Sequence, residues 1–209
     1  AAAIATSDLG QDWDIITDMA IKLVPGGHPY HAFGEAAANA ARDGNIAASD
    51  VDTITISRPG FTKLSGPLHP EDLIGMAHSP AYFTAAGVAD RSFSWIHASD
   101  AKIADPIIHG LIDKVRVGPP PTENADRYRQ GATVTIRTHD GRTSTSTVHL
   151  PKGAGALGIA WDDIDAKYRT LVPASGLPTD KIEASLALIH DFHTVTDVST
   201  LTALLRNGS

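Results

Sequence analysis

Cysteine is absent from the 209-residue sequence, which excludes disulfide bonds, thiolate metal sites and thiol nucleophiles. No stretch reaches the ~18 uninterrupted apolar residues of a membrane helix. No block of five or six basic residues occurs, and the net charge is −7. These features argue against a nucleic-acid surface, because phosphate binding needs clustered Lys and Arg. The opening residues Ala1–Thr6 lack the basic and apolar runs of a signal peptide, so a cytoplasmic protein is the default expectation.

Hydrophobic residues make up 42% of the sequence and charged residues 20%, as in a folded globular protein rather than a disordered one. The length suffices for one domain with a core and an appendage. The first residue is Ala rather than Met, so the sequence fits either a trimmed protein or a piece of a longer one.

Strand signals are concentrated in the middle of the chain. Val51–Ile56 alternates apolar and polar residues, as a half-buried strand does. Val115–Val117 predicts a short strand. Thr133–Arg137 and Thr143–Leu150 flank Asp140-Gly141, and Asp-Gly between alternating runs is typical of a β-hairpin. At least one strand pair is therefore expected to be antiparallel.

Helical spacing of apolar residues occurs on both sides of these strands. Gly44 suits the end of one predicted helix, and Pro80 is expected to kink another. The predicted helices are Asp12–Ile21, Tyr30–Arg42, Pro70–Ala89, Asp105–Lys114, Ala160–Leu171, Asp180–His190 and Val198–Leu205.

This order of elements predicts an α+β fold, with a small antiparallel-containing sheet, packed helices and a helical tail. We expect a helical lead-in at residues 1–21, an α+β domain at 22–158 and the tail at 159–209.

The turn from Lys22 to His31 is the first candidate for chemistry. It places a cation, two glycines and two histidines just before a predicted helix. A helix start with a nearby Lys is a natural anion site, because its backbone N–H groups point toward the ligand. The alternative is an ordinary loop with a solvated lysine.

Two histidine pairs have the three-residue spacing that can hold a metal on a helix: His28 with His31, and His190 with His193. Neither pair has an evident third ligand, and no H-E-x-x-H pattern occurs. We therefore expect no metal, and histidines that face solvent or hydrogen-bond within the core.

His78, Ser79 and Tyr82 form the second candidate. On a single helix His78 and Tyr82 would share a face, as would Ser79 and Tyr82. A Tyr hydroxyl in a pocket can act as an acid, a base or a carboxylate ligand. The alternative is a core tyrosine whose hydroxyl is already hydrogen-bonded.

These segments resemble the MmgE/PrpD family, which includes 2-methylcitrate dehydratase, cis-aconitate decarboxylase and iminodisuccinate epimerase. The resemblance rests on three matches in family order: Lys22-Leu23-Val24-Pro25 with the following glycines and histidines, Ser79-Pro80-Ala81-Tyr82, and Ala132–Ile136 with Asp140-Gly141. The resemblance to the family extends to Leu9–Ile15, to Gly153 and to the Lys167-Tyr168 helix.

The resemblance implies site residues for this chain. Lys22 and Tyr82 match active-site residues of the family and are expected to be catalytic. The expected substrate-binding residues are Gly27, His28, His31, His78 and Ser79. The resemblance implies no cofactor. Cis-aconitate decarboxylases tend to carry a His where this sequence has Gly27, which counts against cis-aconitate as the substrate.

The resemblance also implies a partner. Family members are about twice as long, and a helical first domain supplies the other wall of the cleft. We therefore expect a small polycarboxylate substrate, a helical first-half domain or separate chain, and a homo-oligomer. The expected chemistry is proton removal next to a carboxylate, leading to dehydration, decarboxylation or epimerisation. The alternatives are a non-catalytic binding or assembly module made of the α+β domain alone, which the resemblance implies is a lid over the cleft, and a small histidine-metal enzyme.

Overall fold

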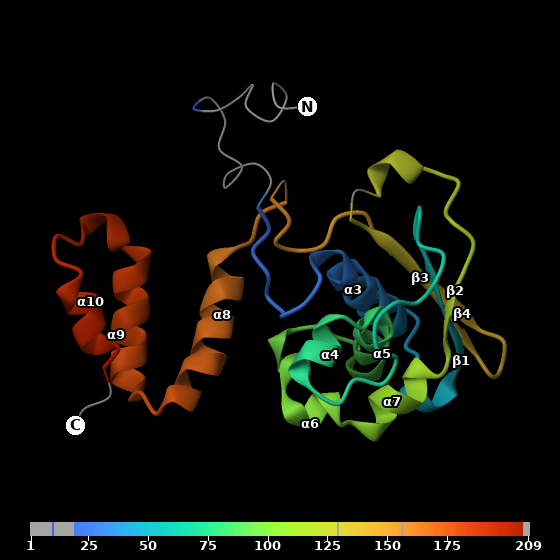
Figure 1. Cartoon of the computed structure of the whole chain (residues 1–209), viewed down its shortest axis with the longest axis horizontal. Helices are drawn as coiled ribbons and strands as arrows, with labels where there is room; N and C mark the ends of the chain where they lie inside the picture. The colour runs from blue at the N-terminus through green and yellow to red at the C-terminus, as the bar shows by residue number, and fades with distance from the viewer. Residues whose placement is uncertain (1–9, 11–18, 129, 156, 207–209) are drawn as a thin grey trace. The chain divides into compact units, whose positions relative to one another are not determined.

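The computed structural model describes residues 10, 19–128, 130–155 and 157–206, and the chain divides into two compact units, residues 1–158 and 159–209. The predicted lead-in helix Asp12–Ile21 lies almost wholly outside the described residues. Figure 1 labels the helices and strands of both units.

The first unit contains a four-stranded sheet in the order β2-β1-β3-β4. Its strands are β1 (Val51–Ser57), β2 (Val115–Val117), β3 (Ala132–Thr138) and β4 (Thr143–Val148). β1 pairs in parallel with β2 and antiparallel with β3, and β3 pairs antiparallel with β4. The predicted α+β class and the hairpin around Asp140-Gly141 are thus confirmed.

The two faces of the sheet differ in chemistry because side chains alternate along each strand. Ile54, Ile56, Val134 and Ile136 are fully buried and belong to the core shared with the helices. The opposite face carries threonine hydroxyls that pair across β3 and β4, at 2.7 Å for Thr133–Thr147 and 2.9 Å for Thr135–Thr145. Helices therefore cover one face of the sheet, as Figure 1 shows.

Two helices form most of the helical layer. Helix α3 (His28–Asp43) packs on β3 and β4, and α5 (Pro80–Asp90) packs against α3. Their contact is built from small residues, since Gly34 and Ala37 of α3 meet Gly87 of α5. Shorter helices complete the layer: α4 (Leu73–Ala77), α6 (Asp100–Ile103) and α7 (Pro106–Ile112).

The single helix predicted over Pro70–Ala89 is wrong, because the structure has two helices there. Helix α4 ends at Ala77. Ser79 then adopts an extended backbone and caps α5, with its hydroxyl accepting the Tyr82 N–H at 3.1 Å. Proline disfavours the helical region for the residue before it and suits the first turn of a new helix. Pro80 therefore breaks the helix instead of kinking it.

The remaining described elements are short or belong to the second unit. Single 3-10 turns occur at η1 (Ala48–Asp50), η2 (Trp95–Ala98) and η3 (Ala125–Arg127). The second unit contains α8 (Trp161–Leu171), η4 (Val172–Ser175), α9 (Thr179–His190), η5 (Phe192–Thr194) and α10 (Ser199–Leu204). The predicted helical tail is confirmed. Within the described ranges, no helix combines the length and apolar character needed to cross a bilayer.

Candidate functional site

The segment that carries Lys22 is held at both ends by backbone hydrogen bonds. The Ile21 N–H donates to the Gly153 carbonyl at 2.8 Å, and the Gly27 N–H donates to the Ala77 carbonyl at 3.1 Å. Val24 between them is buried, whereas Lys22 is exposed. The loop is therefore fixed on the first unit and presents the lysine side chain on its surface.

Gly26 allows this loop to approach α4 and α5 closely. Its φ is +125°, and a Cβ there would lie 2.8 Å from both the Ala77 oxygen and the Phe83 ring. A larger residue would suffer both backbone strain and a clash. The glycine is thus explained by the close approach of the loop to the ends of two helices.

The backbone at the start of α3 is less open to an anion than the sequence predicts. The Gly27 N–H is used by Ala77, the Tyr30 N–H donates to the Gly27 carbonyl at 2.8 Å, and Pro29 has no N–H. Most donors of the first turn are therefore committed. The recognition of an anion here would rest on side chains rather than on the helix start alone.

His28 and His31 are brought together on α3, with ring centroids 5.0 Å apart. His28 is 6% exposed and His31 2% exposed. The Nδ1 of His28 donates to the Gln130 side-chain oxygen at 2.7 Å, which assigns the proton to that nitrogen. Its Nε2 is buried with no hydrogen-bond partner among the described residues. With the proton on Nδ1, the lone pair of the ring lies on Nε2.

Glu35 is a titratable group that the sequence reasoning missed. It lies one helical turn after His31 on α3, and burial raises its pKa to about 7 although the Lys152 N–H and the Lys152 charge act to lower it. Both carboxylate oxygens accept that N–H, at 3.0 and 3.2 Å. A carboxyl group balanced near neutral pH is suited to exchanging a proton, and such groups cluster at functional sites.

Arg58 and Gln130 were also missed. Arg58 lies half-buried after β1, and its guanidinium donates to the Pro29 carbonyl at 3.3 Å. Desolvation lowers the pKa of Arg58, but a guanidinium stays charged at neutral pH. It thus adds a cation beside the first turn of α3. No sequence signal links either residue to α3, because the contacts join distant parts of the chain.

Tyr82 is fully buried, and its hydroxyl donates to the His97 carbonyl at 2.8 Å. Desolvation, followed by the charges of Asp105 and Asp90, raises the pKa of this hydroxyl. Its catalytic role stays a prediction, and the buried, satisfied hydroxyl favours the alternative of a core tyrosine.

His78, Ser79 and Tyr82 do not lie on one helix as predicted, because His78 ends α4 whereas Ser79 caps α5, the helix of Tyr82. His78 ends α4 with an exposed side chain, and its Nδ1 bonds the Ile74 carbonyl at 2.8 Å. Ser79 is buried as the cap of α5 and also donates weakly to the Leu68 carbonyl at 3.5 Å. Their substrate-binding roles stay predictions.

The comparison with protein families matches residues 25–190 to the family described as MmgE/PrpD C-terminal domain. The chain belongs to the MmgE/PrpD family. The match spans most of the chain and includes the last residues of the loop before α3, the sheet and α8–α9, whereas Lys22 lies just before it, so the predicted family and its carboxyl-terminal domain are confirmed. No curated protein matches the sequence closely enough to be reported.

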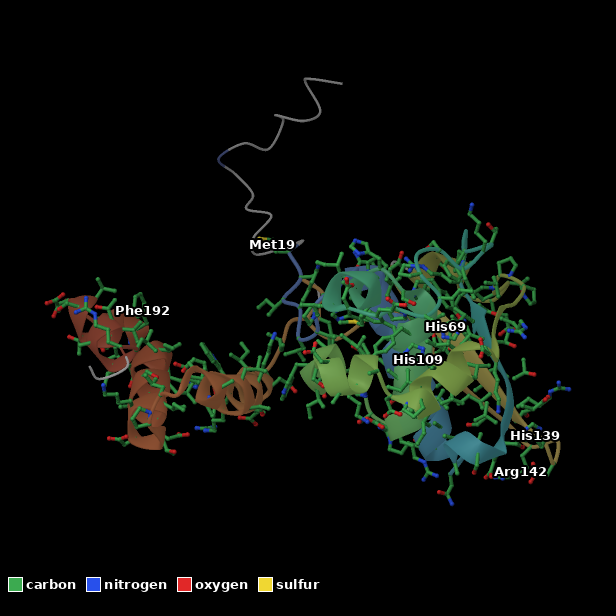
Figure 2. The ribbon with its side chains drawn as sticks, turned by 60° about the horizontal axis from the view of Figure 1, so that its bottom comes forward. Met19, His69, His109, His139, Arg142 and Phe192 are labelled. Atoms are coloured by element: carbon green, nitrogen blue, oxygen red, sulfur yellow. The ribbon has the colours of Figure 1, made fainter. Side chains whose placement is uncertain are left out.

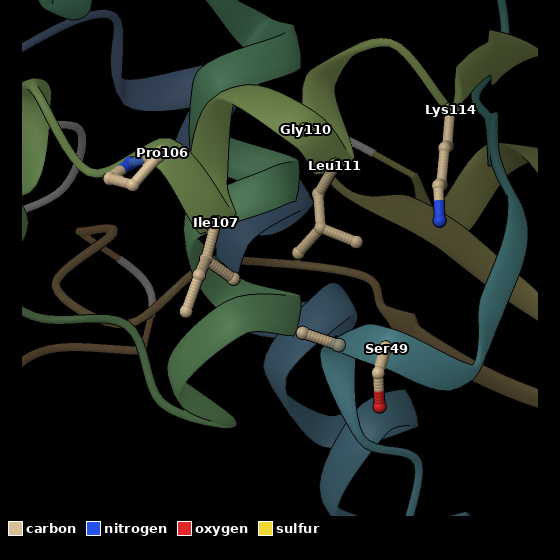
Figure 3. A pocket seen from close by; sticks show the side chains of 7 residues that line it. Ser49, Pro106, Ile107, Gly110, Leu111 and Lys114 are labelled. Atoms are coloured by element: carbon tan, nitrogen blue, oxygen red, sulfur yellow. The ribbon is translucent and has the colours of Figure 1, made fainter.

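A hollow on this MmgE/PrpD domain lies away from these residues. It has a volume of about 340 Å³ and lies between η1 and α7, lined by Ala48, Ser49, Pro106, Ile107, Gly110, Leu111 and Lys114 (Figure 3). The charged group in the lining of the hollow is the Lys114 ammonium, which already donates to the Val51 carbonyl at 2.5 Å. The hollow is therefore a poor candidate for a polycarboxylate site.

A further histidine cluster also lies outside the predicted site. His69 Nδ1 is 2.9 Å from His109 Nδ1, and His69 Nε2 is 2.9 Å from an Asp113 carboxylate oxygen (Figure 2). His109 Nε2 bonds the Ile103 carbonyl at 2.7 Å. This exposed network ties the loop before α4 to α7. In the part of the chain that the structure describes, no group of three or more His, Asp or Glu side chains could hold a metal ion.

Proposed function

We propose that this chain is the carboxyl-terminal portion of a MmgE/PrpD lyase or isomerase acting on a small polycarboxylic acid. The reaction would begin with removal of a proton next to a carboxylate, and would continue by loss of water, loss of carbon dioxide or return of the proton to the other face. The observation that carries the proposal is His28, whose Nδ1–H is fixed by Gln130 and whose Nε2 is buried without a partner among the described residues.

Each side chain then has a chemical role. Lys22, at the end of the tethered loop, would neutralise one carboxylate of the substrate. Arg58 would strengthen the positive field around the first turn of α3. His28 Nε2 would accept the proton, and its imidazolium would then be stabilised by the substrate carboxylate beside it. Proton removal next to a carboxylate creates negative charge on that group, so nearby cations favour the transition state.

The first unit supplies one wall of such a site. The Lys22 side chain is exposed, and water must be excluded for these charges to act strongly. The family has an amino-terminal domain as well, which we propose closes over Lys22 and His28. We expect no turnover by the 209-residue chain alone.

The test compares the chain alone with the chain combined with a helical amino-terminal family domain, assayed against 2-methylcitrate, cis-aconitate and related acids. Lys22→Ala should reduce kcat/KM by about 100-fold or more in the active combination, as expected for a lost charged contact. His28→Gln should lower kcat more than it raises KM. Lys181→Ala serves as a matched control because that lysine bonds the Arg206 carbonyl in the second unit.

The alternative is a binding or assembly module without catalysis. Saturable binding of a polycarboxylate with no turnover in any combination would favour it. Turnover that survives Lys22→Ala unchanged would remove Lys22 from the site, and saturable turnover by the chain alone would contradict the need for a second wall.

A further inference from the structure

The Glu35 carboxylate holds a loop that lies far away in the sequence. Both of its oxygens accept the backbone N–H of Lys152, at 3.0 and 3.2 Å. Glu35 belongs to the middle of α3, a helix with a largely buried surface. The carboxylate therefore attaches the 151–153 turn to a helix whose surface is largely buried.

The same turn holds the segment that carries Lys22. The residue after Lys152 is Gly153, and its carbonyl accepts the Ile21 N–H at 2.8 Å. Two hydrogen bonds and one peptide unit thus connect the Glu35 side chain to the residue immediately before Lys22. The side chain of Lys22 is not part of this path, but its backbone is placed by it.

The backbone of Gly153 shows how tight this connection is. Its φ is +84°, and a Cβ at this position would overlap the Ile21 carbonyl oxygen. Only glycine adopts this conformation at little cost, and only glycine leaves room for the Ile21 segment. The 151–153 turn and the Ile21–Lys22 segment are therefore fitted to each other at backbone distance.

The free-energy cost of desolvating the Glu35 carboxyl group indicates that this residue has a role. Burial raises the pKa of its carboxyl group to about 7, and the charged group that acts on it is Lys152. A partly buried carboxyl is costly compared with an apolar residue. The hydrogen bonds that this carboxylate accepts both come from the Lys152 N–H. The position of the 151–153 turn is therefore what Glu35 secures.

We propose that Glu35 is a positioning residue that sets the placement of Lys22 through the 151–153 turn and the Ile21–Gly153 hydrogen bond. This inference rests on the proposed function in one respect, namely that Lys22 binds a substrate carboxylate. Glu35 itself needs no contact with the substrate. Glu35→Ala removes the acceptor, whereas Glu35→Gln keeps an acceptor oxygen of nearly the same shape and removes the charge.

The first experiment needs no substrate. Amide hydrogen exchange is measured on the 209-residue chain for the N–H groups of Ile21 and Lys152, with Gly27 as an internal reference for the far end of the loop. Glu35→Ala should speed exchange at Ile21 and Lys152 by about ten-fold, which corresponds to the loss of ~1.4 kcal/mol of hydrogen bonding. Glu35→Gln should restore most of the protection. Unchanged exchange at Ile21 in Glu35→Ala would overturn the proposal.

The second experiment measures KM and kcat in the complete enzyme. Glu35→Ala should raise KM by about five- to ten-fold with a smaller change in kcat. The reason is that a displaced Lys22 would bind the carboxylate of the substrate and that of the transition state equally less well. Glu35→Gln should rescue KM. Gly153→Ala should raise KM in the same way without touching Glu35. Lys152→Ala keeps the backbone N–H and should leave the exchange at Ile21 unchanged.

The two experiments separate the possible failures. Faster exchange at Ile21 with an unchanged KM would support the positioning role and contradict Lys22 as the carboxylate ligand. A raised KM without faster exchange would mean that Glu35 acts on the substrate directly, and would overturn the positioning role. A poorly folded Glu35→Ala variant leaves Gly153→Ala as an independent test of the same connection.

Discussion

At the scale of single residues, hydroxyl partners decide between catalytic and structural roles. Tyr82 donates to the His97 carbonyl inside the core, whereas Tyr128 bonds the Thr133 hydroxyl at 2.7 Å on the less buried face of the sheet. A carbonyl that loses its donor in the core cannot be satisfied by water. The two tyrosines therefore provide a matched pair for substitution.

Tyr82→Phe should lower the free energy of unfolding by about 1–3 kcal/mol, because the buried His97 carbonyl would lose its partner. Tyr128→Phe should cost less than about 0.5–1 kcal/mol, since its neighbours are accessible to water. The measurement is urea denaturation of both variants. A Tyr82→Phe variant of unchanged stability, with turnover reduced about ten-fold in the complete enzyme, would instead favour the catalytic role.

The sequence singled out some candidate site residues and missed others, for a physical reason. The Lys22–His31 turn stood out because its lysine, glycines and histidines are adjacent in the chain. Glu35 carried no signal in the sequence, because its contact is with a loop more than a hundred residues later. Tyr82 could be placed on a helix, but no pattern shows which way its hydroxyl points.

At the scale of elements, the α3–α5 contact depends on the absence of side chains. A Cβ on Gly87 would overlap the Gly34 carbonyl oxygen and lie 3.1 Å from both the Ala37 Cβ and the Ala38 N. These neighbours are backbone or short side chains that cannot move aside. Gly110 in α7 is the opposite case, because a Cβ added there would have no neighbouring atom within 4 Å among the described residues.

Gly87→Ala should destabilise the protein by about 1–3 kcal/mol, since overpacking at the helix contact outweighs the ~1 kcal/mol gain in helix propensity. Gly110→Ala should raise stability by up to about 1 kcal/mol from the same propensity. Thermal unfolding of the two variants beside the original chain checks both signs. Equal effects of the two substitutions would contradict the close contact between α3 and α5.

Elements with strong local signals were predicted from the sequence, and those set by distant contacts were not. The Asp140-Gly141 hairpin and the alanine-rich helix α3 follow from turn chemistry and propensity. The parallel pairing of β1 with β2 could not be predicted, because three residues of β2 contain too little periodicity. The break between α4 and α5 was underestimated because the hydroxyl cap of Ser79 completes what Pro80 begins.

At the scale of the whole molecule, the second unit buries few side chains. Its buried described residues are Leu177, Ile182, Ser185 and Leu186. Large apolar side chains are exposed instead, including Trp161 at 50%, Phe192 at 50% and Val198 at 58%. Three short helices of this size form a small core, and where exposed apolar groups are contiguous they usually mark a contact with a partner.

We expect the isolated chain to self-associate through this unit at micromolar concentration. Phe192→Asp combined with Val198→Asp should shift the chain toward the monomer, because charges in an apolar contact are costly to desolvate. Thr194→Asp, an exposed polar position on η5, is the control. Sedimentation velocity over a concentration series measures the effect. A chain that stays monomeric before any substitution would contradict the expectation.

The place of β1 in the sheet has a consequence during protein synthesis. β1 lies between β2 and β3, yet it is made well before either, since β2 begins at Val115 and β3 at Ala132. At translation rates of ~5–20 residues per second, several seconds pass before both partners have left the ribosome. During that interval helices made before β2, such as α3 and α5, can cover the apolar Ile54 and Ile56, but β1 has neither of its sheet partners. A slower ribosome would therefore lengthen the period in which this central strand is open to pairing with other chains.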